Sequence, residues 1–234
     1  MLSITLITNK WKKILFEKYG FPPKKMEIIS KAVIKKYLPN NAVVIDCGAH
    51  DGKDSVELAR LFTNGTVYAF EPAPKIFERL KKRTAPYQNI KCYNLALSDK
   101  IGTAKFYISS GDSDGSSSLL APKEHLDYHP ETVFKETIDV KSETLDSWAG
   151  MHGIEKIDLL WLDMQGYELQ MLKASDKILS TVNVIHTEVS TTELYKEIGL
   201  YADFKSYLEK KGFTVKIEAI PKGWAMGNVM FIRK

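Results

Sequence analysis

Short apolar runs alternate with amphipathic segments along most of this chain. The apolar runs predict seven strands, at residues 42–47, 66–70, 90–95, 157–163, 182–188, 213–219 and 228–233. The segments between them predict helices near residues 53–63, 74–84, 166–174 and 201–211. Because strand and helix alternate, we expect an α/β sandwich with a mostly parallel sheet and helices on both faces. The turn Pro221-Lys222-Gly223-Trp224 predicts that the last two strands form an antiparallel hairpin.

Residues 98–147 interrupt this alternation. They show no good helix pattern, but they contain a predicted hairpin at Thr103 to Ser109 and a strand-like run at Thr137 to Val140. Between these two lies a polar loop, Gly111 to Ser118. An excursion of this length is more often functional than idle, although the polar loop taken by itself is typical of a flexible surface turn.

Residues 1–41 predict a basic helical arm in front of a single domain at residues 42–234. An apolar stripe of Met26, Ile29, Val33 and Tyr37 predicts a helix from about residue 24 to 38, the second of two in the arm, with the lysines mostly off the stripe. The arm carries nine lysines and two glutamates, whereas the rest of the chain carries 24 basic and 27 acidic residues. The positive charge therefore belongs to the arm.

The composition narrows the class of protein. A chain of 234 residues, 44% of them hydrophobic, can bury one substantial core. No apolar run approaches the roughly 18 residues that a membrane span requires, and the first residues do not form a signal peptide pattern. Cys47 and Cys92 lie in strand-like runs without metal or disulfide spacing. We therefore expect free thiols, no membrane span and a cytoplasmic location.

The first predicted strand runs into a glycine turn that suits a nucleoside ligand. Residues 43–52 place Gly48 and Gly52 directly after buried positions, where glycine allows a ligand to approach the backbone closely. The spacing differs from the Gly-x-Gly-x-x-Gly that holds a pyrophosphate. Glu71 ends the next strand, where an acidic side chain accepts hydrogen bonds from a ribose diol. Together with Asp46, this arrangement predicts a site for S-adenosylmethionine.

An ordered set of motifs resembles a known family, the FkbM-type S-adenosylmethionine-dependent O-methyltransferases. The motifs are Val-Ile-Asp-Cys-Gly-Ala-His-Asp-Gly (44–52), Phe-Glu-Pro (70–72), Leu-Ala-Leu-Ser-Asp (95–99), Ser-Ser-Ser-Leu (116–119), Thr-Leu-Asp (144–146) and Ile-Asp-Leu-Leu-Trp-Leu-Asp-Met-Gln-Gly-Tyr-Glu (157–168). The resemblance covers roughly residues 42–190. It implies a class I, Rossmann-like methyltransferase sheet and methylation of an oxygen, often on a sugar or another secondary alcohol.

The resemblance also implies roles for individual residues. The residues implied to line the donor are Asp46, Gly48, Ala49, His50 and Gly52. Glu71 would hold the ribose, Asp163 would lie beside the methionine end, and the residues implied to border the adenine are Ala96, Leu97 and Ser98. The loop residues implied to close over the site and contact donor or acceptor are Ser116, Ser117 and Ser118. Three positions depart from the family pattern, which has Asn at His50, Lys at Trp161 and Glu at Gln165.

Removal of the acceptor proton leaves several alternatives open. An alcohol holds its proton about as tightly as water, whose pKa is about 15.7, so a base or a metal must assist. Period-two alternation puts His186 and Glu188 on one side of a strand that neighbours Asp163. Asp163 and Glu188 could bind a divalent cation such as Mg²⁺ or Mn²⁺. His186 could instead act as the general base. In the third alternative, His186 and Glu188 have only structural roles.

The sequence as a whole predicts an O-methyltransferase that uses S-adenosylmethionine and a carbohydrate or other alcohol acceptor. One alternative is a nucleotide-dependent oxidoreductase on a similar sheet. Another is a non-catalytic module whose lysine arm binds nucleic acid or an acidic partner, although such lysines more often form a solvated helix face. The apolar stripe of the arm would then pack on the sheet or on a second subunit, which leaves an oligomer open.

Overall fold

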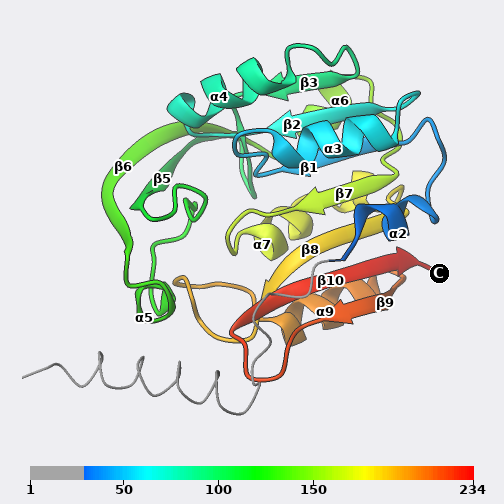
Figure 1. Cartoon of the computed structure of the whole chain (residues 1–234). Helices are drawn as coiled ribbons and strands as arrows, with labels where there is room; N and C mark the ends of the chain where they lie inside the picture. The colour runs from blue at the N-terminus through cyan, green and yellow to red at the C-terminus, as the bar shows by residue number, and fades with distance from the viewer. Residues whose placement is uncertain (1–28) are drawn as a thin grey trace, which may run out of the picture.

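A seven-stranded sheet lies between two layers of helices (Figure 1). The structure is a computed structural model that describes residues 29–234. The strands of this sheet are β1 (Val43–Cys47), β2 (Thr66–Phe70), β3 (Ile90–Tyr93), β7 (Leu159–Leu162), β8 (Val184–Ser190), β9 (Phe213–Ala219) and β10 (Met226–Arg233). Their order is β3-β2-β1-β7-β8-β10-β9. The first five are parallel and β10 is antiparallel to both of its neighbours, which confirms the predicted sheet and its final hairpin.

The helices cover both faces of this sheet. One layer contains α2 (Lys31–Lys35), α3 (Lys53–Leu61) and α4 (Pro74–Thr84). The other contains α6 (Leu145–Met151), α7 (Glu168–Lys173), α8 (Asp176–Leu179) and α9 (Tyr201–Lys210). All four residues of β7 are buried, as expected of a central parallel strand covered on both sides. The predictions missed α6, which begins where the Thr144 hydroxyl accepts a hydrogen bond from the backbone N–H of Ser147 at 3.1 Å.

The interrupting segment forms a second, smaller sheet. It contains β4 (Ala96–Leu97), β5 (Gly102–Gly111) and β6 (Thr132–Glu143), in the order β4-β6-β5, with the short helix α5 (His125–Tyr128) between β5 and β6. The predicted hairpin at Thr103 to Ser109 is wrong, because these residues form one continuous strand that pairs antiparallel with β6. Alternating apolar positions identify a strand but not its partner. Figure 1 shows this sheet beyond the carboxyl ends of the parallel strands.

The described part of the arm packs directly on the main sheet. Ile29 and Ile34 are buried, whereas Tyr37, a member of the predicted stripe, is 40% exposed. Lys31 shares the docked face with Ile34: its ammonium lies 4.5 Å from the centre of the Trp161 ring and pairs with carboxylates of α3. Within α2 the buried residue is Ile34 rather than Val33 of the predicted stripe, and the helix ends at Lys35, before Tyr37, so it is shorter than predicted and faces the sheet with Ile34 and Lys31. Met26 and the first predicted helix lie outside the described residues.

Two further findings concern the whole described chain. Within residues 29–234, no helix combines the length and the apolar character needed to cross a membrane. Cys47 and Cys92 are both free thiols, and burial raises the pKa of each above its usual value.

We expect Ile34→Ala to lower the free energy of unfolding by about 2–5 kcal/mol, because it leaves a cavity between α2 and the sheet. Tyr37→Ala should change it by less than about 1 kcal/mol, since that ring is partly exposed and its described aromatic contact is with Lys216. Urea unfolding of the full chain measures both values. Equal losses in the two variants would contradict the contact face assigned to α2.

Candidate functional site

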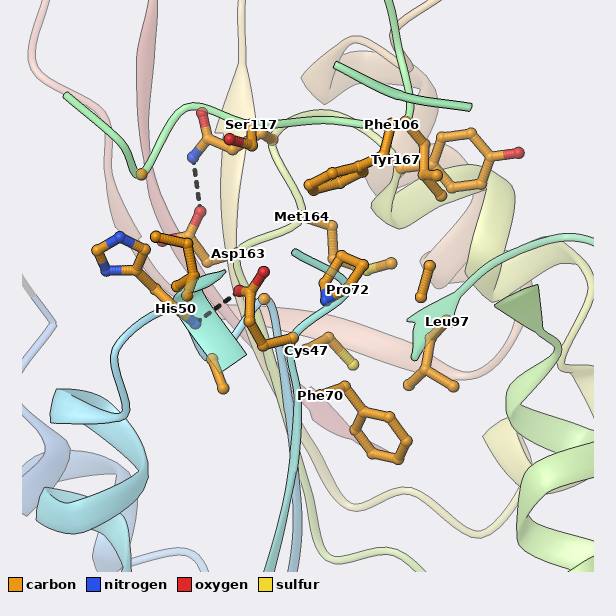
Figure 2. Close-up of a pocket in the computed structure, with 18 of the residues that line it drawn as sticks. Cys47, His50, Phe70, Pro72, Leu97, Phe106, Ser117, Asp163, Met164 and Tyr167 are labelled. Carbon is orange, nitrogen blue, oxygen red and sulfur yellow. Dashed lines mark hydrogen bonds between the residues drawn. The ribbon is translucent and has the colours of Figure 1, made fainter. Parts of the chain in front are cut away.

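A cavity of about 320 Å³ opens at the carboxyl ends of β1, β2 and β7 (Figure 2). The turn after β1, the end of β2 and the turn after β7 form its walls, and residues of β4, β5 and the loop after β5 close it from the other side. Parallel α/β sheets bind their ligands at this edge. The predicted residues that line the cavity are Gly48, Ala49, His50, Glu71, Ala96, Leu97, Ser117 and Asp163.

The glycine turn brings two backbones together under the cavity. Gly48 has φ +79°, and a Cβ added to it would lie 1.8 Å from the carbonyl oxygen of Asp163. Its N–H and that of Ala49 both donate to the carbonyl oxygen of Phe70, at 3.1 and 2.9 Å. A side chain at residue 48 would therefore force the ends of β1 and β7 apart.

Glu71 is buried at the end of β2 with its carboxylate fixed by two backbone donors. Its Oε2 accepts from the N–H of His50 at 3.0 Å and its Oε1 accepts from the N–H of Ala73 at 2.8 Å. Burial raises the pKa of Glu71 to about 7, although both hydrogen bonds favour the ionised form. The site therefore presents an oriented acceptor that changes charge near neutral pH.

Three of the predicted donor residues lie outside the cavity lining. Asp46 is buried beneath the glycine turn, where its Oδ2 accepts from the hydroxyl of Ser55 at 2.5 Å. Burial raises the pKa of Asp46 to about 7. Gly52 begins α3 with φ +84° and packs against Leu80. Ser98 is buried in the turn after β4. These residues support the walls of the cavity rather than facing its interior.

One half of the cavity is an apolar slot that sequence reasoning largely missed. The lining residues of this half that the sequence did not single out are Phe70, Pro72, Ile76, Leu95, Phe106, Leu119, Met164 and Tyr167. Beneath the slot, Phe70 packs edge-on against the buried Trp148 with ring centres 4.9 Å apart. The hydroxyl of Tyr167 donates to Asp99 at 2.6 Å, which fixes that ring. Six of the eight lie within the family motifs without an implied role of their own, whereas Ile76 and Phe106 lie outside every motif and no local pattern indicates them.

Asp163 and Glu188 lie close together, as predicted, with the side chain of Gln165 between them. The Gln165 amide nitrogen donates to Asp163 Oδ1 at 2.7 Å and to Glu188 Oε2 at 3.3 Å. Only Asp163 opens onto the cavity; Glu188 lines a separate small hollow with Glu168 and Tyr195. Burial raises the pKa of both carboxyl groups, and for Glu188 the nearby Asp163 and Glu168 raise it further.

His186 lies away from the cavity, which disfavours the alternative in which it acts as the general base and favours its structural role. Its ring stacks on Trp161 with centres 3.8 Å apart, and neither ring nitrogen has a hydrogen-bond partner in the described part of the chain. Burial and, to a smaller extent, the nearby Lys31 lower the pKa of His186 to about 3. The alternation did place His186 on the same side as Glu188, but helix α2 covers that part of the sheet.

The polar loop from Gly111 to Ser118, the serine loop, closes over the cavity through contacts on both of its sides. Ser117 lines the cavity, whereas the hydroxyl of Ser118 donates to the carbonyl oxygen of Gln165 at 2.8 Å. The carbonyl oxygen of Ser116 accepts from the hydroxyl of Tyr195 at 2.8 Å. On the other side, Asp114 pairs with His50, at 2.8 Å between Asp114 Oδ1 and His50 Nε2. The loop thus spans from the glycine turn to the turn after β7.

Comparison with known proteins identifies a family. The family described as Methyltransferase FkbM domain matches residues 46–215. The 2-O-methyltransferase NoeI of Sinorhizobium fredii is 33% identical over 159 residues, which span 66% of this chain and 65% of NoeI. The methyltransferase sdnD of Sordaria araneosa is 26% identical over 202 residues, 76% of each chain.

Solved structures show the same fold. Fibrillarin of Methanococcus jannaschii, a pre-rRNA processing protein, superposes with a TM-score of 0.51 at 15% identity, over 90% of this chain and 71% of that one. A chain of a fibrillarin/Nop5p complex gives 0.50 at 17% identity, over 87% and 79%. At this level of identity the likeness concerns the fold alone.

We expect His186 to contribute a destabilising share to the change in stability on acidification, which buried carboxyl groups of raised pKa, such as Glu71, oppose. The pKa of His186 is about 3 in the folded chain and about 6.5 when unfolded, so the unfolded chain binds the extra proton first as pH falls below 6.5. Between pH 8 and pH 5 this costs roughly 2 kcal/mol, a loss that His186→Phe should remove. Denaturant unfolding at both pH values measures it. An equal change in the free energy of unfolding between the two pH values, in the wild type and in the variant, would contradict the buried neutral imidazole.

Proposed function

Because this chain belongs to the FkbM methyltransferase family, we propose that it transfers the methyl group of S-adenosylmethionine to a hydroxyl oxygen of a sugar. The observation that carries the proposal is the Glu71 carboxylate, held by two backbone N–H groups between a glycine turn and an apolar slot. This arrangement suits a nucleoside without phosphates. Family membership favours it over a nucleotide-dependent oxidoreductase or a non-catalytic binding module.

The cavity offers a place for each part of the donor. Glu71 would accept hydrogen bonds from the ribose hydroxyls, and the slot around Leu97 and Phe106 would take the adenine. The methionine part would lie along the turn at Gly48, opposite Asp163. The described lining of the cavity contains carboxylates at Asp51, Asp54, Glu71, Asp114 and Asp163, against a lysine at position 53. An acidic lining suits a ligand that carries a positive sulfonium and an ammonium group.

A hydroxyl acceptor fits the polar end of the same cavity. Ser117, His50 and Gln165 border this end, and each can hydrogen-bond a hydroxyl group. The name of NoeI, a 2-O-methyltransferase, supports oxygen as the methylated atom. We infer that the acceptor is a carbohydrate because several hydrogen-bonding side chains converge beside the place of the methyl group.

The carboxylate pair does not suit a divalent cation in this arrangement. The N–H groups of Gln165 point at both Asp163 and Glu188, so a hydrogen-bond donor occupies the position between them that a cation would need. Only Asp163 of the pair faces the donor cavity. We therefore assign Asp163 to the methionine end of the donor and derive no step through a metal.

We expect Glu71→Gln to weaken S-adenosylmethionine binding roughly ten- to hundredfold, because it removes a charged hydrogen-bond acceptor. Since the pKa of Glu71 is about 7, wild-type affinity should fall as pH decreases from 8 to 6, and the variant should show a smaller decrease. Isothermal titration calorimetry measures both effects. Glu78→Gln is the matched control, because that exposed side chain is paired with Lys81 on α4. A Glu71→Gln variant that binds like this control would contradict the assigned ribose contact.

Methyl transfer itself is tested with radiolabelled S-adenosylmethionine and a panel of methyl glycosides of hexoses and 6-deoxyhexoses, with simple alcohols and phenols alongside. We expect transfer to at least one glycoside, and unchanged turnover after treatment with a chelator. Mass spectrometry of the product locates the methylated oxygen. Tight donor binding without transfer to any glycoside would contradict the sugar acceptor, and loss of turnover that Mg²⁺ restores would contradict the metal-independent arrangement.

A further inference from the structure

We propose that His50 is the base that removes the acceptor proton and that Asp114 is the residue that positions it. This inference rests on the proposed methyl transfer to oxygen. It concerns a side chain at a position where the resembling family has asparagine, so it describes chemistry particular to this chain. The two residues are 64 positions apart and meet only through the closed loop after β5.

The backbone fixes the place of the imidazole. His50 has φ +47°, a left-handed conformation that is uncommon for a residue with a side chain. Its N–H donates to Glu71, the proposed ribose ligand, at 3.0 Å. The ring lines the cavity at its polar end, on the glycine-turn side, as Figure 2 shows. The same residue therefore touches the proposed donor site through its backbone and borders the cavity with its ring.

Asp114 fixes the orientation and the tautomer of that ring. Its Oδ1 lies 2.8 Å from His50 Nε2, and its Oδ2 is bound by the guanidinium of Arg79 on α4. A carboxylate only accepts hydrogen bonds, so Nε2 carries a proton, and in the neutral ring Nδ1 keeps its lone pair. Nδ1 lies 4.0 Å from Asp51 Oδ1, which is too far for a hydrogen bond. Nδ1 is therefore able to accept a proton, while Nε2 is held by its hydrogen bond to Asp114.

The other titratable groups of the site are less well placed to act as the base. His186 is buried behind Trp161, and Glu188 lies behind Gln165. Asp163 faces the cavity, but one of its oxygens accepts from Gln165. A positive sulfonium beside Asp163 would stabilise its ionised form and make it a weaker base.

Carboxylates surround the imidazole, although Arg83 already pairs with one of them, Asp51, at 2.5 Å. Asp51 in the same turn, Asp114 on the loop and Asp163 across the cavity are all carboxylates, and each attracts an imidazolium. Arg79 opposes this effect in part, because it pairs with Asp114 and approaches Asp51 to 3.7 Å. A histidine that gains a proton during the reaction is thus stabilised where the charge appears.

The proton and electron balance of the step is complete. The acceptor oxygen forms a bond to the methyl carbon, and the electron pair of the broken carbon–sulfur bond stays on sulfur, which leaves S-adenosylhomocysteine. The hydroxyl proton passes to His50 Nδ1 and then to solvent. No oxidant, reductant or metal takes part. The serine loop must be closed for this step, because Asp114 reaches the ring from that loop.

Two substitutions and one matched control test the proposal. His50→Asn should lower kcat by about 10²–10⁴-fold, the usual contribution of a general base, and change the dissociation constant for S-adenosylmethionine by less than about threefold. Asparagine also tolerates the left-handed backbone of residue 50.

Asp114→Asn should lower kcat by a smaller factor and shift the acidic limb of the pH–rate profile to lower pH, because the imidazolium loses its anionic partner. Asp112→Asn removes the same charge from an exposed position on the same loop and should leave both unchanged. The probe is the methyl glycoside that the wild type methylates fastest.

A second measurement does not need an acceptor. ¹⁵N spectra are recorded of the five histidines in the complex with S-adenosylhomocysteine, and the His50 signals are assigned by their absence in His50→Asn. We expect the His50 ring to carry its proton on Nε2. Asp114→Asn should weaken this preference for Nε2. Turnover of His50→Asn within threefold of the wild type would overturn the proposal. A loss of donor binding in parallel with the loss of turnover would also overturn it, as would a neutral His50 ring with its proton on Nδ1. If the wild type binds the donor but methylates no probe, the proposed function fails, and the ¹⁵N spectra still decide the state of His50.

Discussion

The close approach of two backbone turns sets the position of every group in the cavity. Gly48 lies so near the carbonyl oxygen of Asp163 that even a methyl group could not fit between them. The N–H of Asp163 donates to the carbonyl oxygen of Cys47 at 2.9 Å, so the pairing of β1 with β7 continues to this point. Because the two strands end together, the residues after them lie on opposite walls of one cavity. A wider separation would place His50 and Asp163 in different parts of the surface.

Buried carboxyl groups surround this contact, and their protonation is linked to the binding of a cationic ligand. Burial raises the pKa of Asp46, Glu71 and Glu168 to about 7 each, so protons partly neutralise them near physiological pH. Each group is nevertheless held by hydrogen bonds to its ionised form, from Ser55 to Asp46 and from backbone N–H groups to the two glutamates. Of the three, only Glu71 lines the cavity, and a positively charged ligand there would favour the ionised form that the backbone N–H groups already orient.

The chain outside the main sheet supplies the parts that distinguish this site from a general nucleoside pocket. Phe106 and Leu119 complete the apolar slot, and Asp114 and Ser117 border the polar end. Tyr195, from the segment after β8, holds the serine loop through the carbonyl oxygen of Ser116. In the proposed function, the main sheet and the apolar slot hold the donor, while the loop after β5 borders the acceptor.

The sequence by itself determined the sheet and the strand ends. Apolar runs meet a carboxylate at Asp46, Glu71 and Asp163, close to where each strand ends, and these positions indicated the cavity. The same alternation placed His186 and Glu188 on one side of the strand, about 6.6 Å apart along it. It could not show that α2 covers the part of the sheet that contains His186. Only the tertiary structure decided that Gln165 lies between the two carboxylates and that Asp114 reaches His50. Contacts between residues far apart in the chain depend on how loops fold over the sheet, and local patterns of polar and apolar residues contain no information about that packing.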